Sequence, residues 1–325
     1  MTGLSIFSTH PLHPEVTDAL SGIGAYRVAS APTPEAIVAE SAGAGLIVVR
    51  APVPAEIIAR QTGLRALVRH GAGLDMIPLE AATQAGVLVA NVPGANAVTV
   101  AEHVIWSALA LLRRYPLVNR DLRKVGWDAA RAHADSGREL RGRTIGIVGM
   151  GNVGRSVARI AAQGFAMTVL AHTPRPESLS KDVRPVPLDV LLAEADVVAL
   201  CCPLTDETRG LIGAARIARM RPGAILVNVA RGPVVEEAAL IAALRDERLG
   251  GAAIDVFETQ PLPAGHPFLT LCNVILTPHM AGITEESMLR MGQGVVAEAR
   301  RIASGDLPEQ LVNPEAVARY RERFG

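Results

Sequence analysis

Short apolar runs alternate with amphipathic stretches through the first third of the chain, and this alternation predicts parallel strands connected by helices. Each amphipathic stretch carries a proline near its start, where the missing N–H group does no harm to a helix. We therefore expect a parallel sheet with helices on both faces. The predicted strands are Leu4–Ser8, Leu46–Arg50, Ala66–Arg69 and Val87–Ala90, and the predicted helices are Pro14–Gly22, Pro34–Ala42, Pro54–Gln61 and Pro78–Ala85.

A second series of the same kind follows a long apolar helix that is predicted over residues 96–115. Between the two, residues 117–143 are polar and arginine-rich, with little periodicity after Trp127, and no element is assigned to them. A further helix is predicted from Thr284 to Ser304, and residues 305–325 are predicted to form a polar tail. The predicted strands of the second series lie at residues 144–148, 167–171, 196–201, 224–229, 251–255 and 274–276, as in a doubly wound dinucleotide-binding domain.

The two long helices suggest how the series are connected. We expect the later helix to return the chain to the first domain. Residues 1–100 and 285–325 would then form one α/β domain, and residues 101–284 would form a second domain inserted into it.

Gly149, Gly151 and Gly154 have the spacing G-x-G-x-x-G where the first strand of the second series meets a helix. In such a turn the first glycine permits the bend, the second lets a pyrophosphate approach the backbone, and the third lets the helix pack closely. The helix, predicted over residues 153–163, would direct its first N–H groups and its dipole at an anion. Three glycines alone are weak evidence, but a buried strand before them and an alanine-rich helix after them predict a dinucleotide site.

The composition narrows the class of protein without naming its chemistry. Hydrophobic residues make up 49% of the 325 residues and aromatic residues only 3%, so the cores must be aliphatic. The 32 basic and 32 acidic residues balance, which argues against a nucleic-acid or membrane-surface partner. Three cysteines, no basic leader and no apolar run of membrane-spanning length predict a cytoplasmic protein. His10 and His13 lack further ligands nearby, so no metal is expected.

Three reactive side chains follow predicted strands of the second series, at the edge where open α/β sheets bind ligands. Arg231, in NVARG, could bind a carboxylate through two charge-assisted hydrogen bonds. Asp255 closes a strand and is predicted to face the cofactor cleft. His279, in TPHMAG, is suited to proton transfer near neutral pH. One such residue alone is usually structural, but three in order behind a dinucleotide turn predict an active site.

Over nearly its whole length the chain resembles the D-isomer-specific 2-hydroxyacid dehydrogenases. The resemblance implies a Rossmann cofactor domain inserted into a split, flavodoxin-like substrate domain, and commonly a homodimer. It also implies an NAD(P)-dependent enzyme that interconverts a small-molecule 2-oxo acid and a D-2-hydroxy acid. The motifs that carry it are VRHGAGLD (68–75), NVPGANAVTVAEH (91–103), GMGNVG (149–154), CPLTDET (202–208), NVARG (228–232), DVFETQP (255–261) and TPHMAG (277–282).

The resemblance implies roles for residues of this sequence. Arg231 would anchor the oxo acid, His279 would be the acid–base residue, and Asp255 would hold the nicotinamide carboxamide. Backbone N–H groups at Ala72 and Gly73 would receive the substrate carboxylate, and Gln260 joins Arg231 and His279 in the expected catalytic set. The expected cofactor contacts are Thr99, Gly149, Gly151, Asn152, Val153, Gly154, Thr173, Arg175, Cys202, Val229, Ala230, Arg231, Asp255, His279 and Ala281.

The first departure from the family pattern follows the second strand of the cofactor domain. NAD-using members end that strand with an aspartate that binds the ribose hydroxyls, and Thr173 stands there in this chain. Without that carboxylate nothing repels a 2′-phosphate, and Arg175 could bind one. NADP is therefore favoured over NAD, and the alternative is an NAD enzyme whose Arg175 points to solvent.

The second departure lies in the expected active site, where Gln260 replaces the family's catalytic glutamate. An amide can orient an imidazole but cannot stabilise its charge comparably, so the pKa of His279 is expected to be lower than beside a carboxylate. Glu258, two residues earlier, is an alternative source of that carboxylate.

Two other functions stay open. Formate dehydrogenases of the same superfamily carry glutamine beside histidine because formate gives up a hydride without a proton, and Asn96 and the AEH at 101–103 also match them. The loop at 70–78 instead resembles that of hydroxyacid dehydrogenases. A non-catalytic dinucleotide sensor is the third hypothesis, and the presence of both Arg231 and His279 argues against it.

Overall fold

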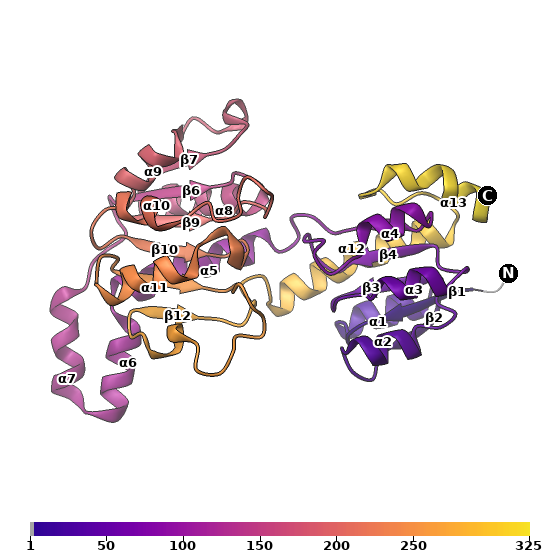
Figure 1. Cartoon of the computed structure of the whole chain (residues 1–325), viewed down its shortest axis with the longest axis horizontal. Coiled ribbons are helices and arrows are strands. Elements are labelled where there is room, and N and C mark those ends of the chain that lie inside the picture. The colour runs from indigo at the N-terminus through magenta and orange to yellow at the C-terminus, as the bar shows by residue number, and fades with distance from the viewer. Residues whose placement is uncertain (1–2) are drawn as a thin grey trace. The chain divides into compact units, whose positions relative to one another are not determined.

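The computed structural model describes residues 3–325, which fold into two compact units (Figure 1). Unit 1 comprises the chain up to Asn96 together with Ile283–Gly325, and unit 2 comprises Ala97–Gly282. Unit 2 is thus inserted into unit 1. The boundaries precede the expected residues 100 and 284 slightly, and the first of them coincides with the start of a helix at Ala97.

Unit 1 is built on a parallel sheet with the strand order β2-β1-β3-β4-β5. This is the order of flavodoxin-like sheets, and it confirms the fold expected for the split domain. The strands are β1 Leu4–Ser8, β2 Gly24–Val28, β3 Leu46–Val49, β4 Ala66–Arg69 and β5 Leu88–Ala90. The helices are α1 Pro14–Ser21, α2 Pro34–Glu40, α3 Ala55–Arg60, α4 Leu79–Gln84, α12 Glu285–Ala303 and α13 Val317–Phe324, with the 3₁₀ turn η5 Pro314–Ala316.

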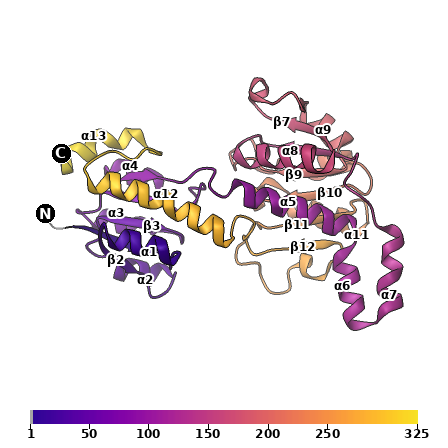
Figure 2. The same ribbon diagram turned by 180° about the vertical axis from the view of Figure 1, so that it is seen from behind.

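Helices cover both faces of this sheet because successive strand residues point to opposite sides. Ile6 packs with α1, α12 and α13, whereas its neighbour Phe7 packs with α2, α3 and α4. The long α12 lies beside α1 (Figures 1 and 2). It begins at a capping box in which Thr284 Oγ1 accepts the Ser287 N–H at 3.2 Å and Ser287 Oγ accepts the Thr284 N–H at 2.9 Å.

Unit 2 is built on a parallel sheet with the strand order β12-β11-β10-β9-β6-β7-β8. This order contains the 3-2-1-4-5-6 arrangement of a Rossmann fold, with one strand added, and confirms the expected Rossmann fold. The strands are β6 Thr144–Val148, β7 Thr168–His172, β8 Val183–Pro185, β9 Val197–Leu200, β10 Ile225–Asn228, β11 Gly251–Ile254 and β12 Val274–Leu276.

Two groups of helices cover the faces of this sheet. Helices α5 and α8 pack on one face, and α9, α10 and α11 pack on the other. A hairpin of α6 and α7 projects from the body of unit 2 (Figures 1 and 2). The helices are α5 Ala97–Leu112, α6 Tyr115–Lys124, α7 Trp127–Ala132, α8 Asn152–Phe165, α9 Leu188–Glu194, α10 Ala214–Arg219 and α11 Glu237–Arg245, and the 3₁₀ turns are η1 His133–Ser136, η2 Pro176–Ser178, η3 Gly232–Val234 and η4 Pro267–Thr270.

Several expectations about local structure are wrong. The predicted polar tail at 305–325 contains α13, whose Tyr320 is buried in the same core cluster as residues of α12. Residues 117–143 contain most of α6 and all of α7, although no element is assigned there from the sequence. The sheet of unit 2 has one strand more than expected, because β8 joins its edge, and β2 is an unpredicted edge strand of unit 1. Both edge strands are partly exposed, so neither shows the continuous apolar run of a central strand.

No helix among residues 3–325 has the length and apolar character needed to span a membrane.

Candidate active site

The candidate residues of unit 2 follow neighbouring strands at one edge of its sheet. Strands β12, β11, β10, β9, β6 and β7 are adjacent in that order and all parallel, so their carboxyl ends meet at the same edge. The residues that follow these strands are, in the same order, His279, Asp255, Arg231, Cys202, Gly149 and Thr173. The structure therefore gathers candidates that lie far apart in the sequence.

The three glycines after β6 have different reasons to be glycine. Gly149 has φ of +95°, and a Cβ there would lie 2.6 Å from Cys202 Cα. A Cβ on Gly154 would lie 2.1 Å from the Gly149 carbonyl oxygen. A Cβ on Gly151, in contrast, would meet no atom within 4 Å. The protein itself does not require glycine at this second position of the motif, which fits a backbone left bare for the pyrophosphate of a dinucleotide.

The amino terminus of α8 is open beside this glycine. Its N-cap is Gly151, which has no side chain that could accept a hydrogen bond from the first N–H groups of the helix. The first N–H groups of a helix have no intrahelical partner, so those of Asn152, Val153 and Gly154 are available to an anion. The residues present thus fit a dinucleotide phosphate.

Two arginines lie near the expected ribose position, Arg175 in the segment after β7 and Arg155 on α8. Thr173 Oγ1 accepts the Arg175 backbone N–H at 3.3 Å, while the exposed Arg175 guanidinium has no partner among residues 3–325. Arg155, in the first turn of α8, donates to the Ser178 carbonyl at 2.7 Å and to its hydroxyl at 2.8 Å. Sequence reasoning missed Arg155, although its position directly after the glycine motif was a signal.

The turn that carries Arg231 is held by the buried side chain of Asn228. Its Oδ1 accepts the Ala230 N–H and its Nδ2 donates to the Arg231 carbonyl, both at 3.1 Å. Gly232 packs directly on the backbone after Asp255, since a Cβ there would lie 2.0 Å from the Phe257 carbonyl carbon. Arg231 itself donates from its guanidinium to the Ala230 carbonyl at 2.6 Å. The turn is therefore fixed against the neighbouring strand connection.

Asp255, which is 3% exposed, ties the loop that carries His279 to β11. Its Oδ1 accepts from the Thr277 hydroxyl at 2.6 Å and from the Met280 N–H at 2.8 Å, and its Oδ2 accepts from the Ala281 N–H at 3.0 Å. The His279 N–H donates to the Asp255 carbonyl at 2.8 Å. The aspartate that the resemblance assigns to the cofactor is thus also the clamp of the His279 loop.

The ring of His279 is exposed and oriented by Gln260. Nδ1 lies 3.1 Å from Gln260 Oε1, and Gln260 Nε2 lies 3.4 Å from the Phe257 carbonyl. An amide oxygen only accepts, so this pairing places a proton on Nδ1 and makes Nε2 the ring nitrogen that would act as acid or base.

A second histidine supports the same loop. His103, on α5, has its Nε2 3.4 Å from Thr277 Oγ1, and its ring lies 5.4 Å from the ring of Trp106. The Thr277 hydroxyl gives its proton to Asp255, so His103 donates to the hydroxyl oxygen. Burial lowers the pKa of His103, and the charge of Asp255 opposes this. Neither His103 nor Thr277 was singled out by sequence, although both lie within motifs of the resemblance.

The other expected contacts of unit 2 are small or apolar. Burial raises the pKa of the Cys201 thiol to about 12 and also raises that of Cys202, so both thiols are protonated packing groups. Thr99 lies buried in the first turn of α5, Ala230 and Ala281 are buried, and Val229 is half-buried. No group of three or more metal-ligating side chains occurs among residues 3–325.

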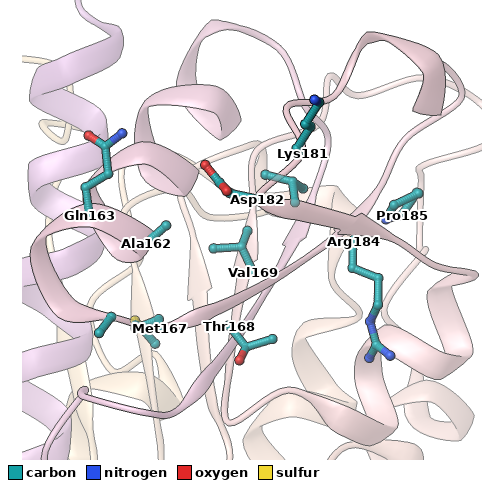
Figure 3. Close-up of a pocket in the computed structure, with 11 residues that line it drawn as sticks. Ala162, Gln163, Met167, Thr168, Val169, Lys181, Asp182, Arg184 and Pro185 are labelled. Carbon is teal, nitrogen blue, oxygen red and sulfur yellow. The ribbon is translucent and has the colours of Figure 1, made fainter.

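A hollow of about 780 Å³ lies at the other edge of this sheet (Figure 3). It is lined by the end of α8, the beginning of β7 and the segment 181–185, with Gln163, Lys181 and Arg184 around it. These residues adjoin the amino-terminal part of β7, away from the glycine turn and His279. The strand-end site, with its open glycine and oriented imidazole, is the better candidate for catalysis.

Unit 1 holds the remaining candidates, Ala72 and Gly73. They lie in the loop that follows β4, at the carboxyl edge of the sheet of unit 1. This is the corresponding ligand-binding edge of a doubly wound sheet.

Comparison with known proteins agrees with this geometry. Residues 105–281 match the family model described as D-isomer specific 2-hydroxyacid dehydrogenase, NAD binding domain. A D-3-phosphoglycerate dehydrogenase from Methanocaldococcus jannaschii is 36% identical over 316 residues, or 95% of this chain and 59% of that protein. A glyoxylate reductase from Korarchaeum cryptofilum is 40% identical over 258 residues, or 78% of this chain and 77% of that one.

Among solved structures, an NAD-dependent formate dehydrogenase from Staphylococcus aureus in complex with NAD has a TM-score of 0.83 and 28% identity. The match covers 95% of this chain and 99% of that chain. The chain spans little more than half the length of the phosphoglycerate dehydrogenase and most of the length of the glyoxylate reductase.

Proposed function

The chain belongs to the D-isomer-specific 2-hydroxyacid dehydrogenases, and we propose that it interconverts a 2-oxo acid and a D-2-hydroxy acid with an NAD(P) cofactor. The observation that carries this proposal is the His279 loop, in which Asp255 clamps the backbone and Gln260 orients the ring. A dinucleotide sensor needs the glycine turn but has no use for an oriented acid–base group at the same sheet edge.

The proposed roles follow from charge and position. When bound, the nicotinamide supplies or accepts the hydride. Arg231 binds the oxo acid and stabilises the negative charge that develops on its oxygen during reduction. His279 gives a proton to that oxygen from Nε2 in reduction and takes it back in oxidation. Asp255 and Gln260 hold the imidazole in place, and the Ala72 and Gly73 N–H groups receive the carboxylate.

NADP is the proposed cofactor in preference to NAD. Thr173 adds no negative charge where a 2′-phosphate would lie, and Arg175, whose guanidinium has no partner within residues 3–325, follows two residues later. Arg155, held by Ser178, adds a second positive charge to the same segment. A 2′-phosphate would therefore meet no repelling carboxylate at position 173 and could bind the positive charge of Arg175, which favours NADP over NAD.

A homodimer is proposed, with the α6–α7 hairpin in its interface. Val125 is 70% exposed and Trp127 is 72% exposed, and Tyr115 and Leu122 are exposed on the same hairpin. Apolar side chains gathered in this way are typical of a surface that another chain covers. A cytoplasmic location is proposed because the three cysteines form no disulfide among residues 3–325.

Formate oxidation is the second candidate, favoured by one observation. Gln260 Oε1, which cannot accept a proton from imidazolium, lies beside His279 Nδ1, as suits a reaction that transfers no proton. The solved formate dehydrogenase that resembles the chain gives this candidate a structural counterpart. The loop at 70–78 resembles that of hydroxyacid dehydrogenases, which favours an oxo acid as the substrate. The names of the curated relatives favour an oxo acid as well.

A spectrophotometric panel tests the proposal. Glyoxylate, hydroxypyruvate, pyruvate and phenylpyruvate are each supplied with NADPH and with NADH, and formate is supplied with NADP⁺ and NAD⁺. We expect the protein to reduce at least one of these oxo acids. His279→Ala should slow that reduction roughly 10²–10⁴-fold, and Arg231→Ala should raise KM for the oxo acid. Formate oxidation without oxo acid reduction would support the second candidate, and a near-normal His279→Ala enzyme would contradict the catalytic assignment.

A further inference from the structure

Arg69 closes the loop that carries Ala72 and Gly73. Its NH1 donates to the His70 carbonyl at 2.8 Å and its Nε donates to the Gly73 carbonyl at 3.1 Å. The same NH1 donates to the Val49 carbonyl, at 2.9 Å, on the neighbouring strand. One guanidinium thus ties both ends of the loop to the carboxyl edge of the sheet.

The two carbonyls between these ends are held by residues that follow β5. The backbone N–H of Val92 donates to the Gly71 carbonyl at 2.9 Å. The side-chain Nδ2 of Asn91 donates to the Ala72 carbonyl at 2.8 Å. Every carbonyl from residue 70 to residue 73 therefore has a donor within unit 1.

The backbone N–H groups of Ala72 and Gly73 point away from these carbonyls. In a planar trans peptide the C=O of one residue and the N–H of the next point in opposite directions. Fixing the Gly71 carbonyl on Val92 therefore fixes the Ala72 N–H, and fixing the Ala72 carbonyl on Asn91 fixes the Gly73 N–H. Neither of these two N–H groups has a hydrogen-bond partner within the part of the chain that the structure describes.

Two arginines place positive charge beside the loop. Arg69 ends β4 directly before the loop, and Arg50 follows the neighbouring strand β3. Burial and the positive charges of these two arginines lower the pKa of His70 to about 4. A positive field of this kind, together with consecutive free N–H groups, is the environment that binds a carboxylate.

We propose that Asn91 and Arg69 are positioning residues that preset the Ala72 and Gly73 N–H groups to receive the substrate carboxylate. Neither touches the substrate in this arrangement, since each acts through a loop carbonyl. Asn91 sets the direction of one N–H, and Arg69 keeps the loop closed. The inference rests on the proposed function, which places a carboxylate at this loop.

Asn91→Ala and Arg69→Lys are the test variants, and Arg323→Lys is the matched control. Arg323 also holds three carbonyls of unit 1, those of Thr62, Leu64 and Ala85, but these precede β4 and β5 at the other edge of the sheet. KM for glyoxylate should rise about tenfold in each test variant, as for one displaced hydrogen bond to a charged group. The Kd of the nicotinamide cofactor should stay within twofold of the parent value, and the control should change neither quantity.

A second measurement does not depend on turnover. Oxalate, a substrate-like dicarboxylate, is titrated into parent and Asn91→Ala protein with the cofactor present, while the amide resonances of Ala72 and Gly73 are followed by NMR. Oxalate should shift both resonances in the parent, and the Gly73 shift should need about tenfold more oxalate in the variant. Undisturbed resonances elsewhere in unit 1 would show that the variant is folded.

The outcomes separate this inference from the proposed function. A parent enzyme that reduces no oxo acid, but whose Gly73 resonance responds to oxalate through Asn91, would contradict the function and support the positioning role. A parent that reduces glyoxylate, with KM unchanged in both test variants, would support the function and overturn the inference. Equal oxalate titrations in parent and Asn91→Ala would also overturn it.

Discussion

Oδ1 of Asp255 lies 2.8 Å from the backbone nitrogen of Met280, so the residue after β11 fixes the loop after β12. The loop needs this support because His279 has φ of +54°, a left-handed conformation that costs a non-glycine residue about 1–3 kcal/mol. The bonds from Thr277, Met280 and Ala281 to one buried carboxylate offset that cost.

Asp255→Asn should therefore destabilise the protein and slow the reaction. Asparagine keeps one acceptor and turns an NH₂ group toward loop N–H donors, which leaves at least one of them unsatisfied. The loss should be about 1–3 kcal/mol in the free energy of unfolding, measured with urea, and kcat should fall as His279 is released. Asp182→Asn, at an exposed position, is the control. A variant as stable and active as the parent would show that the clamp is dispensable.

The glycines after β6 should separate binding from folding. Gly151→Ala adds a methyl group where no atom lies within 4 Å, so the melting temperature should stay near that of the parent while dinucleotide affinity falls by at least tenfold. Gly154→Ala pushes a methyl group into the Gly149 carbonyl and should lower the melting temperature. Calorimetry gives both quantities. Undiminished dinucleotide binding by Gly151→Ala would mean that the open space is not the pyrophosphate site.

Arg175 should decide the choice between the two dinucleotides. Arg175→Ala should weaken NADPH binding by about 1.5–3 kcal/mol, the value of a hydrogen bond to a charged group, and leave NADH little changed. Thr173→Asp should shift the preference toward NADH, because its carboxylate repels a 2′-phosphate. Arg159→Ala, also exposed and further along α8, is the matched control for lost charge. Equal losses for NADPH and NADH would remove the support for NADP.

His70 should make unit 1 sensitive to mild acid. Its pKa is about 4 in the folded chain against about 6.5 when exposed, because it is buried near Arg50 and Arg69. Between these values the unfolded chain binds a proton that the folded chain refuses, so stability falls as pH drops from 6.5 to 4, by about 3 kcal/mol at most.

The measurement is urea unfolding of the parent and of His70→Leu at pH 8 and pH 5. At pH 8 the imidazole is neutral in both states, so the difference between the two proteins there reports packing alone. The parent should lose more stability than the variant between the two pH values. Parallel losses would show that His70 is not the acid-sensitive group.

The sequence predicted most of the fold because buried parallel strands are continuous apolar runs and their helices begin beside prolines. It missed β2 and β8 because edge strands are half exposed and need no such run. It also missed α6 and α7. Most side chains of this hairpin are exposed, so charged and apolar residues alternate along it without a clear buried face. Helix α13 was hidden for a related reason, because its buried face is little more than Tyr320.

The candidate site divides in the same way. Motifs identified residues that would touch a ligand, such as Arg231 and His279, because their chemistry is explicit in the side chain. The residues that support them act through backbone groups, as Asn228 does for the Arg231 turn. Which carbonyl a side chain binds depends on the path of the chain in space, and spacing along the sequence does not encode it.

The residue at position 260 determines how well the charged form of His279 is stabilised. Gln260 Oε1 accepts from Nδ1 of the imidazole and, being neutral, stabilises the imidazolium less than a carboxylate at the same position would. In the proposed reaction, reduction of an oxo acid would consume the proton on Nε2 and need His279 charged, whereas oxidation of the hydroxy acid would need it neutral. The partner of Nδ1 therefore sets the pH range of each direction.

Gln260→Glu should shift the alkaline limb of the reductive profile upward, because the new carboxylate raises the pKa of His279. A shift of about one to two pH units is expected for an opposite charge in direct contact. The measurement is kcat/KM for reduction of the same oxo acid against pH in both proteins. Glu258→Gln is the matched control, since it removes the nearby carboxylate that sequence left as an alternative, and its profile should coincide with that of the parent. If Glu258→Gln moves the limb downward while Gln260→Glu leaves it in place, then Glu258 is the group that sets the charge of His279. If formate is the substrate, no profile should show this limb, because that reaction transfers a hydride and no proton.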